Sequence, residues 1–311
     1  MRVSAFLMQD VVPVATQSEA EARRTPPRRV LLLHTPRLRA SAGLAEQIAA
    51  RLRDWRVETA IGSLEDESVD RELAIADMAI ALGGDGTMLR AGCLAAPHDI
   101  QVLGVNLGRL GFLAEVQPGE WPDALARVMA CDYWLERRMM LRVALEREGT
   151  APRVFDVLNE VFVGRGSTGR TVRVEAYIDG GLFLRYVADG VIVATPTGST
   201  AYALAAGGPI LPPELKNILL VAVAPHMIMD RPVVLDEGTT VELRVASEHH
   251  TVLSADGRDP VALARDDRVR VQSSPYVCRF VRVQPRSYFY RTLLARMTRN
   301  PAADLESNPN Q

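Results

Sequence analysis

The sequence predicts a two-part fold: an amino-terminal α/β domain with a mostly parallel sheet and flanking helices, followed by an all-β, sandwich-like domain. Up to about residue 134, apolar strand-like runs alternate with amphipathic helical patterns, which is typical of a parallel sheet covered on both faces. From residue 138 to about 283 the chain is a succession of strand-like runs separated by turns such as Asp179-Gly180 and Asp189-Gly190. The 311 residues suffice for two such domains.

The expected elements follow the chain in order. The α/β domain occupies residues 28–136, with strands at 30–34, 57–62, 78–82 and 100–108 and helices at 42–55 and 120–130. The all-β domain occupies residues 137–284, and a helical pattern within 285–298 is expected to pack back onto the first domain. Residues 1–27 are interpreted as a flexible extension, and the polar residues 299–311 as a disordered tail.

Composition excludes several classes of protein. A net charge of −2 leaves no excess of basic charge for nucleic acid or an anionic membrane surface. The apolar stretches are too short to span a bilayer, and the first residues lack the pattern of an export signal. Three isolated cysteines, Cys93, Cys131 and Cys278, form no C-x-x-C pair and suit a reducing cytoplasm. We therefore expect a cytoplasmic protein that binds neither nucleic acid nor a membrane.

Several catalytic motifs are missing. Lys216 is the only lysine, so the chain has neither the Gly-Lys-Ser/Thr of a P-loop nor the strand lysine of a protein kinase. It also lacks the Gly-x-Gly-x-x-Gly turn of a Rossmann domain and the Gly-x-Ser-x-Gly elbow of a hydrolase. The five histidines have no metal-ligand spacing. If the protein handles ATP, it uses backbone amides, arginine and a metal ion rather than lysine.

The first informative motif is Gly83-Gly84-Asp85-Gly86-Thr87, which follows an apolar strand and precedes a helical pattern. A glycine-rich turn at a helix start offers free N–H groups and the helix dipole to an anion, so it favours phosphate. The alternative is a tight strand–helix turn in which Asp85 is a cap. The motif alone leaves both interpretations open.

A second motif is Thr-Pro-Thr-Gly-Ser-Thr-Ala-Tyr at 195–202, between the apolar strand 191–194 and an alanine-rich helix that ends at Gly207-Gly208. Its hydroxyls and N–H groups lie at a helix start, and the small side chains leave room for a ligand. A capped helix packed tightly on the sheet would use the same residues. Six turn-type residues in a row ahead of an alanine-rich helix favour a bound nucleotide.

Polar residues also interrupt an apolar strand at Asn159-Glu160. Such a pair must find hydrogen-bond partners or face a cavity, unless it is a surface pair on an edge strand. Asp189 and Asp256 lie in strand-turn contexts, where simple turn roles are the default.

Taken together, these motifs resemble a known family. Gly83 to Thr87, the stretch GVNLGRLGFLAE at 104–115, Asn159-Glu160, TPTGSTAYALAAGGPI at 195–210 and APHMIMDRPVV at 224–234 occur in the order found in NAD kinases. The resemblance covers roughly residues 28–298. Diacylglycerol and sphingosine kinases share the glycine motif, but not the Gly-Ser-Thr-Ala-Tyr stretch or the Asn-Glu pair.

The resemblance implies an enzyme that transfers the γ-phosphate of ATP to the 2′-hydroxyl of the adenosine ribose of NAD, giving NADP and ADP. ATP is expected with Mg²⁺ or another divalent cation, and no residue is expected to bind a metal directly. The all-β domain would bind NAD, and the family suggests a homodimer or homotetramer built through that domain. Inorganic polyphosphate as an alternative donor stays open. The competing interpretations are a lipid kinase of the diacylglycerol or sphingosine type and a non-catalytic NAD(P)-binding regulator.

The resemblance also implies roles for single residues. Asp85 matches the proton acceptor for the 2′-hydroxyl and is the expected catalytic residue. A carboxylate with a pKa of about 3.9 is too weak to deprotonate the hydroxyl outright, but it can accept the proton late in the reaction. The expected ATP-phosphate contacts are Gly83, Gly84, Gly86 and Thr87. The expected NAD contacts are Asp85, Gly86, Arg90, Asn159, Glu160, Arg170, Asp189, Thr200, Ala201, Tyr202, Ala205, Ala224, Asp256 and Arg258. Ala205 and Arg258 depart from the serine and glutamine of many bacterial members.

Overall fold

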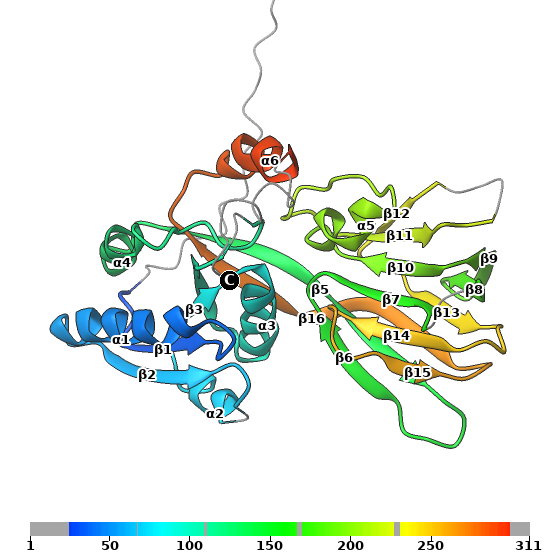
Figure 1. The fold of residues 1–311 in the computed structure, drawn as a ribbon, viewed down its shortest axis with the longest axis horizontal. Helices are drawn as coiled ribbons and strands as arrows, with labels where there is room; N and C mark the ends of the chain where they lie inside the picture. Colours follow the sequence, from blue (N-terminus) through cyan, green and yellow to red (C-terminus); the bar gives the residue numbers. More distant parts are fainter. Residues whose placement is uncertain (1–24, 67, 109–110, 167–169, 227–230, 299–311) are drawn as a thin grey trace, which may run out of the picture.

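The computed structural model describes residues 25–66, 68–108, 111–166, 170–226 and 231–298. Figure 1 shows two lobes side by side: an α/β lobe with α1, α3 and α4, and a larger lobe made of β-strands. Two long strands, β5 and β16, run from one lobe into the other. The expected tail 299–311, and all but the end of the expected extension 1–27, lie outside the described residues.

The α/β lobe has four parallel strands in the order β2-β1-β3-β4. Its elements are β1 (Arg29–His34), α1 (Arg39–Asp54), β2 (Glu58–Ser63), α2 (Val69–Leu73), β3 (Met78–Gly83), α3 (Asp85–Ala95), the 3₁₀ turn η1 (Ala96–His98), β4 (Gln101–Asn106) and α4 (Trp121–Met129). The strands, α1 and α4 were expected within three residues, and a helical pattern without an end was expected where α3 begins, whereas α2 and η1 were not expected. The five-residue α2 is too short to give a periodic pattern.

Alternating side chains of the central strands explain why this lobe folds as three layers. Val30 and Leu32 of β1 point into a core shared with α1 and α4, whereas Leu31 and Leu33 point into a core shared with α2 and α3. Every residue of β3 is buried, as a strand covered on both faces requires. This burial accounts for the continuous apolar run Met78–Leu82 in the sequence.

The β lobe is a sandwich of two sheets. Its elements are β5 (Trp134–Glu146), β6 (Arg153–Val157), β7 (Glu160–Arg165), β8 (Val172–Ile178), β9 (Gly181–Ala188), β10 (Gly190–Ala194), η2 (Gly198–Thr200), α5 (Tyr202–Ala205), β11 (Asn217–Val223), β12 (Val233–Asp236), β13 (Val241–Val245), β14 (Thr251–Ala255), β15 (Val261–Leu263) and β16 (Arg268–Arg282). The last helix, α6 (Tyr288–Thr298), follows β16, and its Phe289 packs against Phe112 of the loop after β4, with ring centroids 6.4 Å apart. One sheet is antiparallel, in the order β12-β11-β10-β7-β14-β15. Side chains of both sheets fill the core between them, including Leu141, Val163, Val193 and Leu243.

The other sheet of the sandwich is continuous with the sheet of the α/β lobe. Its ten strands include the path β2-β1-β3-β4-β16-β13-β8-β9, and β5 pairs with β16 along most of its length. The connection is the short parallel pairing of Arg279 and Phe280 in β16 with β4. The position where we expected one domain to follow the other, 136/137, lies inside β5. The shared sheet fixes how the two lobes face each other.

Strand order also predicts where a ligand can bind. The strand β1 lies between β2 and β3, so the chain leaves β1 toward one neighbour and later returns to pair on its other side. In open α/β sheets, ligands bind beyond the carboxyl ends of the strands at such a reversal. Here that position is flanked by Thr35, after β1, and Gly84, after β3. Among the described residues, no helix is both long and apolar enough to cross a membrane.

Candidate active site

The glycines of the first motif have different structural roles. A Cβ atom on Gly83 would lie 2.2 Å from Oγ1 of Thr87, so this glycine is required by packing between β3 and α3. A Cβ on Gly84 or Gly86 would meet nothing within 4 Å. The start of α3 therefore borders open space at Gly84 and Gly86, as a site that admits a phosphate group to the backbone requires.

The side chain of Asp85 joins the start of α3 to the loop after β4. Its Oδ2 accepts a hydrogen bond from the N–H of Phe112 at 2.6 Å, and its Oδ1 accepts one from Leu113 at 3.0 Å. Gly111 has no room for a side chain, because a Cβ there would lie 2.1 Å from Oδ1 of Asp85. Asp85 is half-buried rather than freely exposed between its glycines. Each carboxylate oxygen retains a lone pair that can accept a further hydrogen bond.

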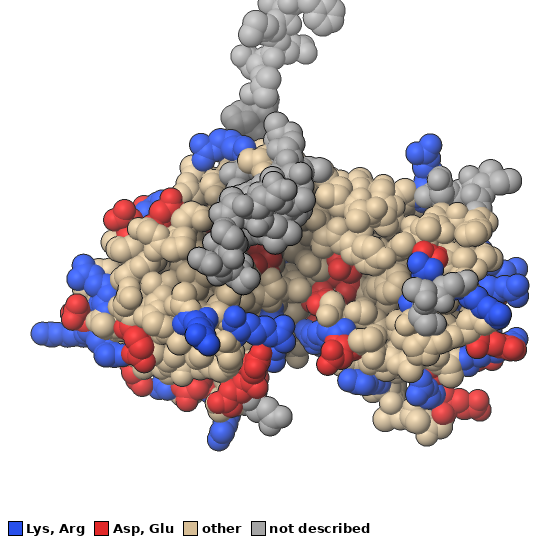
Figure 2. Space-filling model, in the orientation of Figure 1, with Lys and Arg blue, Asp and Glu red and all other residues tan. Residues whose placement is uncertain are grey.

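A cleft of about 990 Å³ opens beside the start of α3. Six of the expected site residues line it: Gly84, Gly86, Thr87, Arg90, Asp256 and Arg258. In Figure 2 the surface is indented between the two lobes, and basic and acidic side chains lie on either side of the indentation. The volume is in the range of small-molecule sites.

Sequence reasoning missed part of this cleft. Thr35 and Arg37, directly after β1, and Asp156 of β6 line it as well. The first two were detectable, because they follow the carboxyl end of a strand beside the expected phosphate site. Asp156 gave no such signal, since β6 is brought to the cleft only by its pairing with β5.

The Asn159-Glu160 pair and the 195–202 motif lie against each other. The N–H of Thr195 donates to the carbonyl of Asn159 at 2.8 Å, and its hydroxyl donates to the carbonyl of Leu158 at 2.6 Å. Leu158 in turn belongs to the core that includes side chains of α3. The two motifs, 35 or more residues apart in sequence, therefore form one cluster next to the helix that carries Asp85.

The hydroxyls of the 195–202 motif are mostly satisfied within the motif. Ser199 donates to the carbonyl of Pro196 at 2.6 Å, and Thr200 donates to that of Thr197 at 3.2 Å. The helix α5 has only four residues, so it offers no strong dipole to an anion. The half-buried Thr200 and Ala201, and the exposed Tyr202 and Ala205, are left to meet a ligand. The ring of Tyr202 packs on Phe162, with the centroids 5.6 Å apart.

Asp256 holds the backbone of the Asn159-Glu160 segment. Its carboxylate accepts N–H hydrogen bonds from Leu158 at 2.8 Å, Asn159 at 2.8 Å and Glu160 at 3.1 Å. Burial raises the pKa of Asp256, and the three amides partly offset this effect. The thiol of Cys93 in α3 also donates to this carboxylate, at 3.5 Å. Asp256 thus lines the cleft, while its carboxylate is used to hold the backbone of the Asn159-Glu160 segment.

Glu160 carries a buried carboxyl oxygen without a partner. Its Oε2 finds no hydrogen-bond partner among the described residues. Burial, followed by the charge of Asp256, raises the pKa of Glu160 to about 8. Buried polar atoms are normally paired, so an unpaired oxygen beside the expected nucleotide site suits a ligand that hydrogen-bonds to it.

Three expected residues lie elsewhere. Asp189 and Ala224 lie at the first end of β10, where Gly190 pairs with Val223. Glu160 lies at the last end of β10, where it pairs with Ala194. The four steps from Gly190 to Ala194, at about 3.3 Å each, place these ends roughly 13 Å apart. Asp189 forms an ion pair with Arg165 at 2.9 Å, and the exposed Arg170 follows the same strand, β7. Within one chain, Arg170, Asp189 and Ala224 do not join the Asn159-Glu160 cluster.

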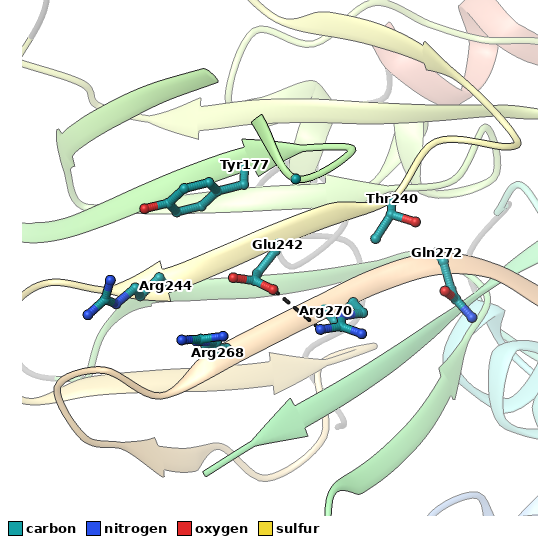
Figure 3. Close-up of a pocket in the computed structure, with 8 residues that line it drawn as sticks. Tyr177, Thr240, Glu242, Arg244, Arg268, Arg270 and Gln272 are labelled. Carbon is teal, nitrogen blue, oxygen red and sulfur yellow. Dashed lines mark ion pairs between the residues drawn. The ribbon is translucent and has the colours of Figure 1, made fainter. Parts of the chain in front are cut away.

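A second hollow, of about 380 Å³, lies on the outer face of the sandwich (Figure 3). It is lined from β8, β13 and β16, by residues that include Tyr177, Glu242, Arg268 and Arg270. Arg270 is paired with Glu242 at 3.6 Å. None of the expected site residues lies in this hollow.

The fold and the site define a two-lobed α/β and β protein with a cleft beside a glycine-rich helix start and a carboxylate at that start. Comparison with known protein families identifies the family of this chain. Residues 30–133 match the ATP-NAD kinase N-terminal domain, and residues 158–283 match the ATP-NAD kinase C-terminal domain. The chain belongs to the NAD kinase family, so the expected family, fold class and phosphotransferase activity are confirmed.

Individual relatives agree. The chain is 42% identical over 273 residues to an NAD kinase from Chloroflexus aurantiacus, covering 88% of this chain and 99% of the relative. It is 42% identical over 259 residues to one from Heliobacterium modesticaldum, covering 79% and 91%. Among solved structures it resembles yeast NADH kinase complexed with NADH, with a TM-score of 0.76, 24% identity and 89% of each chain covered. It also resembles an Archaeoglobus fulgidus NAD kinase in complex with ATP, with a TM-score of 0.69, 25% identity and 86% and 98% covered.

The raised pKa of Glu160 predicts a pH-dependent stability. Between about pH 4.5 and 8 the folded protein retains a proton on Glu160 that the unfolded chain releases, so this group destabilises the fold progressively as pH rises. Glu160→Gln removes the ionisation. Thermal unfolding without nucleotides should therefore show the variant gaining stability relative to wild type from pH 5 to pH 9. A difference in melting temperature that stays constant across this range would contradict the raised pKa.

Proposed function

We propose that Asp85 accepts the proton of the adenosine 2′-hydroxyl of NAD while that oxygen attacks the γ-phosphorus of ATP. The observation that carries this proposal is the Asp85 carboxylate at the start of α3, between two glycines that border open space. The new bond joins the 2′-oxygen to the γ-phosphorus, and the bond from that phosphorus to the β–γ bridging oxygen breaks. The products are NADP and ADP, and the proton moves to the carboxylate.

The chain's own residues supply positioning and charge. The N–H groups near Gly84 and Gly86 would receive the phosphates, and the amides of Phe112 and Leu113 hold the carboxylate in one orientation. Phosphoryl transfer depends mainly on such positioning and on electrostatic stabilisation. Arg37, Arg90 and Arg258 line the cleft and would offset phosphate charge in the absence of a P-loop lysine.

The divalent cation is proposed to enter with ATP. Among the described residues, no group of three or more histidine, cysteine or acidic side chains is arranged to hold a metal ion. A Mg²⁺ ion bound to phosphate oxygens needs few protein ligands, which fits this donor set. Inorganic polyphosphate presents the same kind of oxygens, so polyphosphate as a donor stays open. The three free cysteines support a reducing, cytoplasmic location.

The NAD site is proposed to use Asp85, Gly86 and Arg90 of α3 in one lobe and a cluster of β-lobe residues in the other. Asn159, Glu160 and the exposed parts of Thr200, Ala201 and Tyr202 would contact the dinucleotide, with Ala205 next to them on α5. The unpaired Oε2 of Glu160 supports this assignment. A lipid kinase would leave the Asn159-Glu160 cluster without a role.

We further propose that a second copy of the chain completes the NAD site. Arg170, Asp189 and Ala224 lie at the wrong end of β10 to reach the Asn159-Glu160 cluster of their own chain. In a two-fold symmetric assembly formed through the β lobe, each chain presents the same surface to its partner, so these residues can contribute to the partner's site. The assembly would be a homodimer or a homotetramer.

Replacing Asp85 with Asn tests the proton acceptor. We expect kcat to fall roughly 10²–10⁴-fold, because the amide cannot accept the proton. The melting temperature should also fall, because the amide nitrogen of Asn cannot accept one of the two backbone N–H groups, and a hydrogen bond to a charged group contributes about 1.5–3 kcal/mol. The matched control is Asp77→Asn, because Oδ2 of Asp77 also accepts two backbone N–H bonds, from Arg28 and Arg29, but at the opposite end of β3. Normal turnover by the Asp85 variant would contradict the mechanism.

Mixing subunits tests the shared site. Asp85→Asn and Asp189→Ala should each be nearly inactive at low NAD concentration. After the two proteins are unfolded and refolded together, a heterodimer has one site with both native residues. Half of the dimers then have half of their sites intact, so about a quarter of wild-type activity should return. If the mixture stays as inactive as its components, Asp189 serves its own chain or none.

A further inference from the structure

A cluster of charged side chains lies buried behind the loop that holds Asp85. Arg138 of β5, Arg282 of β16, Glu136 of β5 and Glu115 are each at most 5% exposed. Glu136 Oε2 accepts hydrogen bonds from Nε of Arg138 at 3.0 Å and from Nε of Arg282 at 2.7 Å. Both guanidinium groups also lie over the ring of Phe280, at 5.4 and 5.1 Å from its centroid.

The cluster reaches the backbone of the loop. Nη1 of Arg282 donates to the carbonyl oxygen of Leu113 at 2.6 Å. Nη2 of Arg138 donates to the carbonyl oxygen of Phe112 at 3.5 Å, a longer contact. The N–H groups of these same two residues donate to the carboxylate of Asp85. The loop is therefore held from behind through its carbonyl groups, and it holds Asp85 in front through its amides.

One peptide group takes part on both sides. The carbonyl of Phe112 and the N–H of Leu113 belong to the same planar peptide unit. Arg138 donates to the carbonyl end of that unit, and the N–H end donates to Oδ1 of Asp85. Hydrogen bonds in such a chain polarise and strengthen one another, and the rigid plane transmits orientation.

Stability alone does not account for this cluster. Buried ion pairs often contribute no more than apolar residues of similar size would, because desolvating the charges is costly. The charges do balance: two arginines face Glu136 and Glu115, and Glu115 also accepts the N–H of Val283 at 2.6 Å. Burial would raise the pKa of Glu136, but the two arginines outweigh it and lower that pKa to about 2. The cluster thus stays charged throughout neutral pH.

We propose that Glu136, Arg138 and Arg282 are positioning residues that fix the orientation of the Asp85 carboxylate through the peptide groups of Phe112 and Leu113. They touch neither substrate. This inference rests on the proposed role of Asp85 as proton acceptor. It assigns a function in catalysis to β5 and β16. These two long strands bring the cluster to the junction of the two lobes.

Arg282→Met is the main test, because it removes the guanidinium that donates to the carbonyl of Leu113. It leaves Arg138 with two buried carboxylates, Glu136 and Glu115, so the melting temperature should also fall. We expect kcat to fall roughly tenfold while KM for ATP and for NAD changes by less than about twofold, since only orientation in the reaction is lost. Hydrogen exchange at the amides of Phe112 and Leu113 should become roughly tenfold faster. Arg282→Lys is the second variant, for use if the Met variant folds poorly. It keeps the positive charge but loses the forked guanidinium donors, so kcat and amide exchange should change in the same directions by smaller factors.

A double-mutant cycle with Asp85→Asn separates positioning from general destabilisation. If Arg282 acts through Asp85, Arg282→Met should cause no further loss of kcat in the Asp85→Asn background. The matched control is Asp267→Asn, which removes a buried carboxylate from a pair with Arg147 at 2.6 Å. Arg147 directly follows β5 and Asp267 directly precedes β16, at the strand ends away from the loop. It should lower the melting temperature and leave kcat unchanged.

Three results would overturn the inference: normal kcat in folded Arg282→Met, unchanged exchange at the two amides, or an additive loss in the double variant. The exchange measurement needs no activity. If Asp85→Asn were itself fully active, the proposed mechanism would fail, while exchange would still decide whether the cluster holds the loop.

Discussion

The site depends on the pair of hydrogen bonds between the Asp85 carboxylate and the amides of Phe112 and Leu113. They fix a charged side chain at the start of α3, where the helix dipole also favours it. They also tie the start of α3 to the loop after β4. The distance between the carboxyl ends of β3 and β4 is thereby fixed. A carboxylate held in this way loses little freedom when a hydroxyl approaches, which is the advantage of a preorganised site.

The continuous sheet carries that constraint to the rest of the molecule. Because β16 pairs with β4 in the α/β lobe and with β13 in the β lobe, the two lobes cannot rotate freely about a flexible linker. The same strand places Arg282 behind the Asp85 loop. Asp256 has a comparable role on the other side of the cleft, where its carboxylate organises three amides of the Asn159-Glu160 segment. Each half of the site is thus shaped by a carboxylate that binds backbone amides.

Local features of this site were readable in the sequence, and contacts between distant segments were not. The turn at Gly84-Asp85-Gly86 follows from a buried strand, two glycines and a helix start, all within ten residues. The contact between Asp85 and Leu113 crosses 28 residues, and the one between Asp256 and Leu158 crosses 98. No periodicity or turn rule encodes such pairings. Asp256 consequently looked like either a turn residue or a ligand contact, and its part in shaping the site emerged only from the fold.

The limits of pattern reasoning are also visible in the β lobe. The alternating runs predicted a sandwich correctly, but they did not show that β5 and β16 continue into the first sheet. They also could not show that Asp189 and Asn159 lie at opposite ends of neighbouring strands, because strand pairing decides which ends meet. The family resemblance grouped these residues by function, and the fold separates them within one chain.

The most direct test of the central claim is a crystal structure with NAD, Mg²⁺ and a non-hydrolysable ATP analogue. The account predicts that the adenosine 2′-oxygen lies about 2.6–3.2 Å from a carboxylate oxygen of Asp85, with the analogue's phosphates at Gly84 and Gly86. A complex in which the 2′-hydroxyl points away from Asp85, or in which the phosphates bind away from the start of α3, would contradict it.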